Sequence, residues 1–223
     1  MCWFSSLTER LSCMTPVNLG DTNRYKTIHD LHLRWDAYDT GRWYTDVLVE
    51  YASKPEVKTV TEFGTYQGMS ATAFFTTDIE ELHSIDMSFA RMQQGEVQLI
   101  GRLKNPEARW YLHEQSSHQE IDWTSDLIFI DTVHEHDHVA KELRLHHEKA
   151  NKYIVIHDTN YPKGSAPMDP NTVEMAVREF LAAYSDDWAE VYHDKSHTGM
   201  IILERQPEDE FWSKGYEEHQ RGD

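Results

Sequence analysis

The chain has 223 residues, 39% hydrophobic and 12% aromatic, which is enough for one sizeable folded domain and excludes a disordered chain. Its 21 Lys and Arg against 39 Asp and Glu give a formal net charge of −18, which argues against nucleic acid or an anionic membrane as partner. We see no apolar run long enough to span a bilayer, no secretory signal, and no disulfide framework in Cys2 and Cys13. We therefore expect a cytoplasmic protein that acts on a small molecule.

The N-terminal part has a helical pattern. Residues 22–53 carry apolar side chains at helical spacing, and a break at 36–41 separates two predicted helices. We assign residues 1–56 to an N-terminal helical extension that caps the domain or supports a homo-oligomer. Residues 57–205 form the main domain, and residues 206–223 form an acidic tail.

From Val57 onward, short apolar runs alternate with longer amphipathic stretches. This alternation predicts an α/β fold, in which helices cover both faces of a mostly parallel sheet. The expected strands are Thr59–Phe63, Glu81–Asp86, Arg109–His113, Leu127–Asp131, Tyr153–His157, Glu190–His193 and Met200–Leu203, and the expected helices cover about 69–77, 88–102, 135–149 and 171–184. The last two strands are close in sequence, so we expect an antiparallel hairpin at the sheet edge.

The first two strand ends carry residues that suit a nucleotide-like ligand. Gly64 and Gly68 allow a tight turn and a close backbone approach, and Ser70 opens the following helix. Asp86 ends the second strand, where an acid can accept hydrogen bonds from both hydroxyls of a ribose. The glycine turn is a weak signal alone, but turn and acid in this order favour a nucleoside-containing ligand.

Two later strands each end on an aspartate, Asp131 and Asp158. Adjacent carboxylates repel unless a cation lies between them or one of them holds a proton. Together with an oxygen from Thr159 or Asn160, they would form a hard, oxygen-rich site that suits Mg²⁺. The alternative is that one acid caps a helix and the other is solvated.

His134 follows Asp131 by three residues. An imidazole with an ordinary pKa of about 6.5 can remove a hydroxyl proton near neutral pH. The alternative is a residue at a helix start that merely contacts Asp131. His134 and His138 are four residues apart, and Asp131, His134 and His157 could form a facial triad for iron. We interpret the other histidines here as part of a polar, solvated helix face: His136, His146 and His147.

A long loop follows the fifth predicted strand, from Tyr161 to Asn171. Such a loop at the carboxyl edge is typical of a lid or substrate wall. Tyr161, Trp43, Tyr44 and His157 are the expected lining of an acceptor pocket that suits a sugar or aromatic ring.

Four segments in the same order and spacing, EFGTYQGMS, SIDMS, DLIFIDTVHEHDHV and YIVIHDT, resemble class I S-adenosylmethionine (SAM)-dependent methyltransferases. Within this class they are similar to the small metal-dependent O-methyltransferases of the catechol type, and to the branch of macrocin O-methyltransferase and cephalosporin-hydroxylase-like proteins. The resemblance covers about residues 57–204. It implies a Rossmann-like seven-stranded sheet with an antiparallel edge hairpin, SAM as cofactor, and Mg²⁺ or another divalent cation.

The resemblance also implies site residues. The methionine end of the cofactor would be held by Glu62, Gly64, Tyr66, Gly68 and Ser70. The ribose would be held by Asp86, and the adenine would be approached by Gln115 and Ser116.

For the chemistry, the resemblance implies that Asp131 and Asp158 ligate the metal and that Asp131 also contacts the cofactor. Thr159 stands where the catechol type has asparagine and is a weaker ligand, so Asn160 or water would take over. His134 stands in the place of a lysine general base, which makes His134 and Asp131 the expected catalytic residues.

We therefore predict a SAM-dependent, divalent-metal-assisted O-methyltransferase acting on a hydroxyl of a small molecule such as a saccharide or natural product. Two alternatives stay open. A mononuclear-iron hydroxylase or a hydrolase on the same fold would need His134 or His157 for Fe²⁺ or Zn²⁺. A non-catalytic SAM-binding module would keep its cofactor affinity after loss of Asp131, Asp158 or His134.

Overall fold

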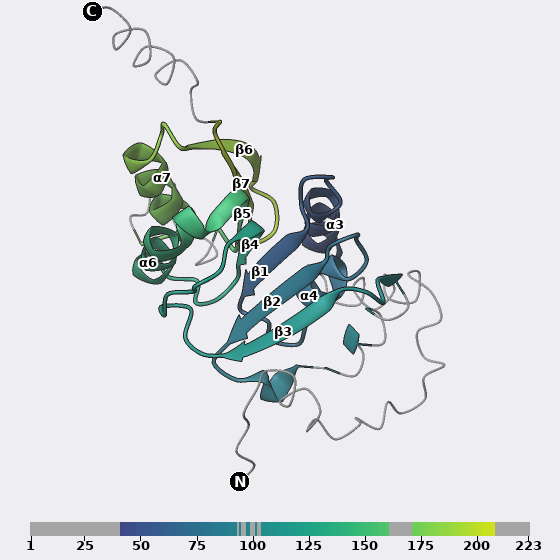
Figure 1. Ribbon diagram of the computed structural model, residues 1–223. Helices are drawn as coiled ribbons and strands as arrows, with labels where there is room; N and C mark the ends of the chain where they lie inside the picture. The colour runs from purple at the N-terminus through teal and green to yellow at the C-terminus, as the bar shows by residue number, and fades with distance from the viewer. Residues whose placement is uncertain are drawn as a thin grey trace, which may run out of the picture.

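A seven-stranded sheet runs through the centre of the protein (Figure 1). The computed structural model describes residues 41–160 and 171–207, apart from 93, 95–96, 99–100 and 102–103. The strands are β1 (Thr59–Phe63), β2 (Glu81–Asp86), β3 (Arg109–Glu114), β4 (Ser125–Ile130), β5 (Ala150–His157), β6 (Trp188–Asp194) and β7 (Met200–Arg205). Their order across the sheet is β3-β2-β1-β4-β5-β7-β6.

The first five strands are parallel to one another, and β7 pairs antiparallel with both β5 and β6. This confirms the predicted mostly parallel sheet with an antiparallel hairpin at one edge. The order places β1 and β4 side by side in the middle, with their carboxyl ends at the same edge. The strand order reverses there, because β2 and β3 lie on one side of β1 while β4 and β5 lie on the other. Ligands bind at such a point in open α/β sheets.

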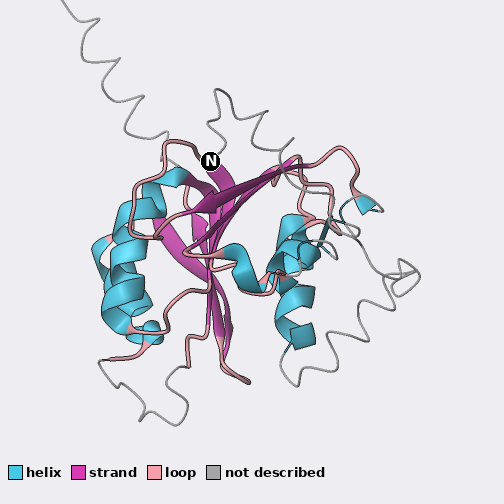
Figure 2. Cartoon of the chain, turned by 90° about the horizontal axis from the view of Figure 1, so that it is seen from below, coloured by secondary structure: helices cyan, strands magenta, loops and turns pink. Residues whose placement is uncertain are grey.

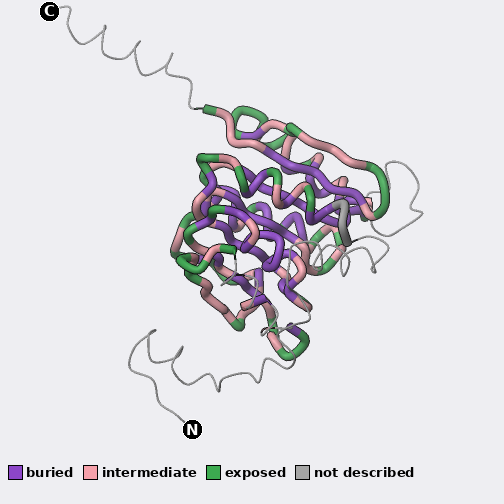
Figure 3. Tube along the Cα trace, turned by 90° about the vertical axis from the view of Figure 1, so that its right-hand side faces the viewer, coloured by how far each residue is buried: buried purple, intermediate pink, exposed green. Residues whose placement is uncertain are grey.

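Helices cover both faces of the sheet (Figure 2). One face packs against α3 (Gly41–Ala52) and α4 (Met69–Phe74), through Leu48 and Phe74 among others. The opposite face packs against α6 (His136–His146) and α7 (Val173–Ala183), through side chains such as Leu143 and Val177. The central strands are accordingly buried (Figure 3).

The helix α3 comes from the segment that the sequence assigns to the N-terminal extension. Its side chains Tyr44, Leu48 and Tyr51 are buried in the same core as the β-strands. The other predicted N-terminal helix lies outside the described residues. Every described helix is too short or too polar to cross a membrane.

Two predictions about helices need correction or qualification. In place of the start of the predicted helix 88–102, a short 3-10 turn, η1, covers Phe89–Arg91, and part of the remainder lies outside the described residues. The interpretation of His146 and His147 as solvated was wrong, because both are buried. His146 stacks on Phe63, with ring centroids 4.5 Å apart, and the second 3-10 turn, η2 (His147–Lys149), ends α6 against α7.

Local polar contacts explain where two elements begin. Thr172 caps α7, because its hydroxyl accepts a hydrogen bond from the backbone amide of Met175 at 3.3 Å. Asp126 on β4 accepts hydrogen bonds from the amides of Lys58 and Thr59, both at 2.9 Å, which fixes the start of β1 against β4. Ser125 and Thr61 also share a hydrogen bond of 2.7 Å between these strands.

Candidate functional site

The turn after β1 has a backbone that only a few residue types adopt easily. Gly64 and Gly68 have φ angles of 87° and 85°, and Tyr66 between them also has a positive φ of 46°. A side chain at Gly64 would collide with the carbonyl oxygen of Asp131, so this glycine lets the ends of β1 and β4 meet. Gly68 stands directly before α4, with its left-handed backbone at the helix N-terminus.

Glu62, the residue before this turn, is fully buried. Its carboxylate accepts hydrogen bonds from three hydroxyls: those of Ser70 and Ser84 at 2.5 Å each, and that of Thr65 at 3.1 Å. Burial raises the pKa of Glu62 to about 7, although the three hydroxyl groups oppose that rise. The Ser70 hydroxyl is therefore engaged by Glu62, and the buried carboxyl group stabilises the turn through Thr65 and Ser70.

Asp86, at the end of β2, is tied to the same turn. Its Oδ2 atom accepts hydrogen bonds from the backbone amides of Thr65 and Tyr66, both at 3.0 Å. Its Oδ1 atom accepts one from the amide of Ser88 at 3.1 Å. The side chain is only partly buried, and Oδ1 accepts one hydrogen bond where Oδ2 accepts two, so Oδ1 has a lone pair left for a ligand.

The loop after β3 lies beside the carboxyl end of the neighbouring strand, β2. The amide of Gln115 donates to the carbonyl of Asp86 at 3.0 Å, which holds this loop beside the end of β2. The Ser116 hydroxyl accepts from the amide of His118 at 3.1 Å. Both Gln115 and Ser116 are partly exposed.

Three large apolar side chains are exposed along this edge of the sheet. Tyr66 after β1, Met87 after β2 and Val133 after β4 are 56%, 70% and 45% exposed. These strands are consecutive in the sheet, in the order β2-β1-β4. Since exposed apolar side chains that gather beside polar groups commonly mark a binding surface, this edge suits a ligand with an apolar, planar part.

On the other side of the glycine turn, Asp131, His134 and Asp158 come together, as the sequence predicts for the two carboxylates. The Nε2 atom of His134 lies 2.8 Å from Asp158 Oδ2 and 3.3 Å from Asp131 Oδ1. One ligand atom from each residue lies within 4.8 Å of the others, so the group can hold a metal ion. The backbone of Asp158 has a positive φ of 56°, which is uncommon for a non-glycine residue and marks a site under constraint.

The charges in this group are strongly coupled. Burial alone would lower the pKa of His134, but the two aspartates raise it to about 10. Burial would raise the pKa of Asp131, but His157 and His134 hold it well below its ordinary range. In the absence of another cation, His134 is therefore an imidazolium between two carboxylates at neutral pH, which differs from the ordinary pKa that the sequence led us to expect.

His157 belongs to the same group, as in the triad with Asp131 and His134 that the sequence left open beside a contact with substrate. Its Nδ1 atom lies 3.3 Å from Asp131 Oδ1 and 3.4 Å from Asp158 Oδ1, and its Nε2 atom lies 3.4 Å from the hydroxyl of Thr198. Burial lowers the pKa of His157, but Asp131 and Asp158 together raise it above its ordinary value. Tyr44 of α3 packs on this ring, with centroids 4.6 Å apart, so α3 contributes to the site.

Thr159 and Asn160, the other predicted metal ligands, contact the turn between β6 and β7. The side-chain amide of Asn160 donates to the carbonyl of Lys195 at 2.6 Å, and its backbone amide donates to Thr198 at 2.7 Å. The buried Thr159 hydroxyl faces the backbone of Gly199. Two of the predicted acceptor contacts, Tyr161 and the side chain of Trp43, lie outside the described residues.

No protein-family model and no curated protein matches the chain. Solved structures do match it. The O-methyltransferase TomG from Streptomyces achromogenes, solved with SAM, aligns with a TM-score of 0.56 and 13% identity over 90% of this chain and 95% of that one. The SAH-bound methyltransferase PaMTH1 from Podospora anserina aligns with a TM-score of 0.53 and 16% identity, over 93% and 99% of the two chains. The chain has the class I methyltransferase fold. Magnesium protoporphyrin IX methyltransferase (ChlM) from Synechocystis PCC 6803, solved with SAM, also aligns, with a TM-score of 0.52 and 13% identity over 79% and 80%.

Proposed function

We propose that this protein is a SAM-dependent O-methyltransferase that acts on a hydroxyl of a small molecule with the help of a divalent cation. The observation that carries the proposal is the placement of two groups on either side of one glycine turn. Asp86 and the exposed Met87 follow β2 on one side, and the paired carboxylates Asp131 and Asp158 follow β4 and β5 on the other. The first group suits a nucleoside and the second suits a cation with an oxygen acceptor.

The residues present fit the nucleoside part of SAM. Asp86 is fixed by the turn amides with its carboxylate still partly exposed. The remaining lone pair of Oδ1 suits one ribose hydroxyl, and a second hydroxyl would have to replace a turn amide at Oδ2. Met87, the next residue, adds exposed apolar surface that suits the adenine. For the methionine end, Ser70 would have to exchange its bond to Glu62 for one to the ligand.

The donors near Asp131 fit a divalent cation, which would be held by Asp131 and Asp158 with His157 beside them. Because imidazole nitrogens join the carboxylates, Mn²⁺ or another first-row ion suits this set at least as well as Mg²⁺. When bound, such an ion lowers the pKa of a coordinated hydroxyl and orients it.

His134 has two roles in this proposal. While both carboxylates face it, the imidazole keeps its proton and serves as their counter-charge, so it cannot act as a base. When the carboxylates are engaged by a cation, His134 loses the interactions that raise its pKa and can accept a proton from the substrate hydroxyl. Methyl transfer is an in-line displacement, so the remaining task of the site is to align the acceptor oxygen with the methyl group.

Titration calorimetry with SAM tests the cofactor half of the proposal. Chelator-treated wild-type protein should bind SAM with micromolar affinity. Hydrogen bonds to a charged group contribute about 1.5–3 kcal/mol, so Asp86→Ala should weaken binding at least about tenfold. Glu81→Gln is the matched control, since it removes an acid from the opposite end of the same strand and should leave affinity unchanged. No SAM binding by the wild-type protein would refute the proposal.

Methyl transfer to hydroxyl acceptors of the saccharide and catechol classes tests the second half, with Mg²⁺ or Mn²⁺ supplied. Asp158→Asn should abolish metal-dependent turnover while SAM affinity stays within a few-fold of wild type. Turnover that persists in this variant would show that the paired carboxylates have no part in the reaction.

One observation favours a second candidate, a mononuclear-iron enzyme. His134 Nε2 and His157 Nδ1 both lie 3.3 Å from Asp131 Oδ1, so two imidazoles and a carboxylate converge as in a facial triad. This candidate predicts tight Fe²⁺ binding that His157→Ala abolishes, and no affinity for SAM. The calorimetry described above therefore separates the two candidates.

A further inference from the structure

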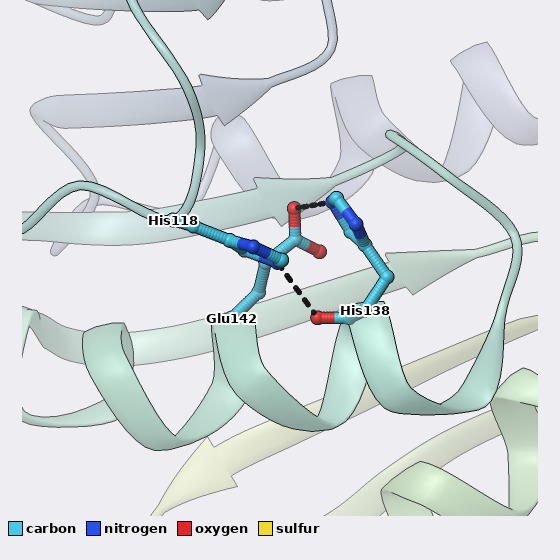
Figure 4. A group of neighbouring side chains, drawn as sticks. All are labelled: His118, His138 and Glu142. Atoms are coloured by element: carbon cyan, nitrogen blue, oxygen red, sulfur yellow. Dashed lines mark hydrogen bonds and ion pairs between the residues drawn. The ribbon is translucent and has the colours of Figure 1, made fainter.

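A second group of metal-binding side chains lies on α6, outside the site proposed for methyl transfer (Figure 4). His138 and Glu142 are one helical turn apart, so they lie on the same face of the helix. The loop between β3 and β4 brings His118 over this face. One ligand atom from each of the three residues lies within 4.8 Å of the other two.

Glu142 is the least expected member of the group, because its side chain is 0% exposed. Its Oε1 atom accepts a hydrogen bond from the Thr132 hydroxyl at 2.8 Å and lies 3.0 Å from His138 Nε2. Its Oε2 atom is buried and has no hydrogen-bonding partner among the described residues. A carboxylate oxygen buried in this way is costly unless a cation or a donor faces it.

The two histidines supply the complementary ligands. Their rings lie close together, with centroids 4.0 Å apart, and both side chains are partly exposed, which leaves a path for an ion to enter. Imidazole nitrogen is a poor ligand for Mg²⁺ and Ca²⁺, which prefer oxygen, whereas two imidazoles and one carboxylate are a common donor set for Zn²⁺. The composition of the group therefore favours Zn²⁺ over Mg²⁺ and Ca²⁺.

We propose that His118, His138 and Glu142 bind a zinc ion that fastens the β3–β4 loop to α6. The loop already contacts this helix, because Ser117 accepts a hydrogen bond of 2.7 Å from His146 at its carbonyl. The same loop begins with Gln115 and Ser116, the residues expected near the adenine. The zinc ion would thus hold in place a loop that borders the cofactor side of the domain, and it would take no part in the chemistry.

The test uses the full chain in an Asp158→Asn, His157→Ala background, which takes a ligand from both cation candidates at the other site. After chelator treatment and reloading with Zn²⁺, bound metal is measured by plasma mass spectrometry, and the geometry is probed by the absorption spectrum of the Co²⁺ form. We expect one zinc per chain. Loss of a partner outside the ligand set already costs about 10–100-fold in metal affinity, so His118→Ala or His138→Ala should cost at least about 100-fold.

His136→Ala is the matched control, because His136 lies on the same helix but pairs with Asp137 and Glu179 instead. It should keep the zinc and the Co²⁺ spectrum. Glu142→Gln preserves side-chain size, so it should lose zinc even if a histidine variant is unstable. Absence of zinc from the background protein, or full retention by the His118 and His138 variants, would overturn the proposal. SAM calorimetry on the same proteins reports on the methyltransferase proposal separately, so the two can fail independently.

Discussion

Replacement of Glu62 by glutamine should remove a large part of the pH dependence of stability. The carboxylate is fully buried, and its pKa is raised from 4.5 to about 7, mainly by burial. The folded state therefore holds this proton more tightly than the unfolded chain does. The stabilisation is complete below pH 4.5 and is lost as the pH rises to about 7.

The size of this loss of stability follows from the difference between the two pKa values. Each pH unit between the two pKa values corresponds to about 1.4 kcal/mol, so the full loss is about 3 kcal/mol. Most of it, about 2.5 kcal/mol, falls between pH 5 and pH 8 by the same relation. The glutamine side chain of the Glu62→Gln variant cannot ionise, and the three hydroxyl groups can still bond to it because a hydroxyl both donates and accepts.

Urea unfolding followed by tryptophan fluorescence at pH 5, 6, 7 and 8, with a chelator present throughout, measures this effect. Wild-type protein should lose about 2.5 kcal/mol more than Glu62→Gln across the series. Glu120→Gln, which removes an exposed carboxylate from the β3–β4 loop, should follow the wild-type curve. If wild type and Glu62→Gln have parallel curves, the buried carboxylate does not have a raised pKa and our account of the turn is wrong.

Two further predictions concern the contacts between β1 and β4. Gly64→Ala should lower the free energy of unfolding by about 2–5 kcal/mol, because the left-handed backbone disfavours alanine and the new methyl group meets the Asp131 carbonyl. Thermal and urea denaturation measure this. Gly101, where a new methyl group would lie 3.3 Å from the Phe75 side chain and the φ angle is not positive, is the control, and a loss at Gly64 no larger than that of Gly101→Ala would contradict the prediction. Asp126→Asn should cost about 1–3 kcal/mol at pH 7. Burial raises the pKa of Asp126, but Asn151 and the amides of Lys58 and Thr59 lower it overall, so the difference should shrink as the pH falls below 5 towards the folded-state pKa. An unchanged difference at low pH would contradict that reasoning.

Much of the fold could be predicted from the sequence, because buried parallel strands are continuous apolar runs. The bounds predicted for β1 and β2 are those observed. The start of β4 was missed by two residues, since Ser125 and Asp126 are polar. Their place in the sheet depends on hydrogen bonds to Thr61 and Thr59, which no count of apolar residues detects.

For the candidate site, the positions of residues in the chain predicted which side chains meet, but the sequence did not predict their protonation. Because β4 and β5 are neighbours, the aspartates that follow them were expected to meet, and they do. The protonation of His134 depends on both carboxylates at once, and this is a property of the folded arrangement alone. The signal for His157 was present in its place directly before Asp158, but Asp131, Thr198 and Tyr44, which it contacts, come from distant segments.

The histidines of α6 show the clearest limit of sequence reasoning. Polar residues along a helix normally indicate a solvated face, and His146 and Glu142 follow that pattern in the sequence. They are buried because the β3–β4 loop, which has no regular structure between Gln115 and Thr124, lies over them. The path of such a loop is set by tertiary contacts, so the grouping of His118 with His138 could not have been predicted.

The position of β7 has a consequence for the order in which the protein can be built during synthesis. This strand is the last of the seven to leave the ribosome, yet it lies between β5 and β6 and bonds to both. Until residues 200–205 emerge, the nascent chain exposes the open edge of β5, and β6 has no strand to join. Completion of the sheet must therefore wait for nearly the whole domain to be translated. A chain that stops before Met200 would lack the hairpin, and the unpaired edge of β5 could pair with a strand of another chain.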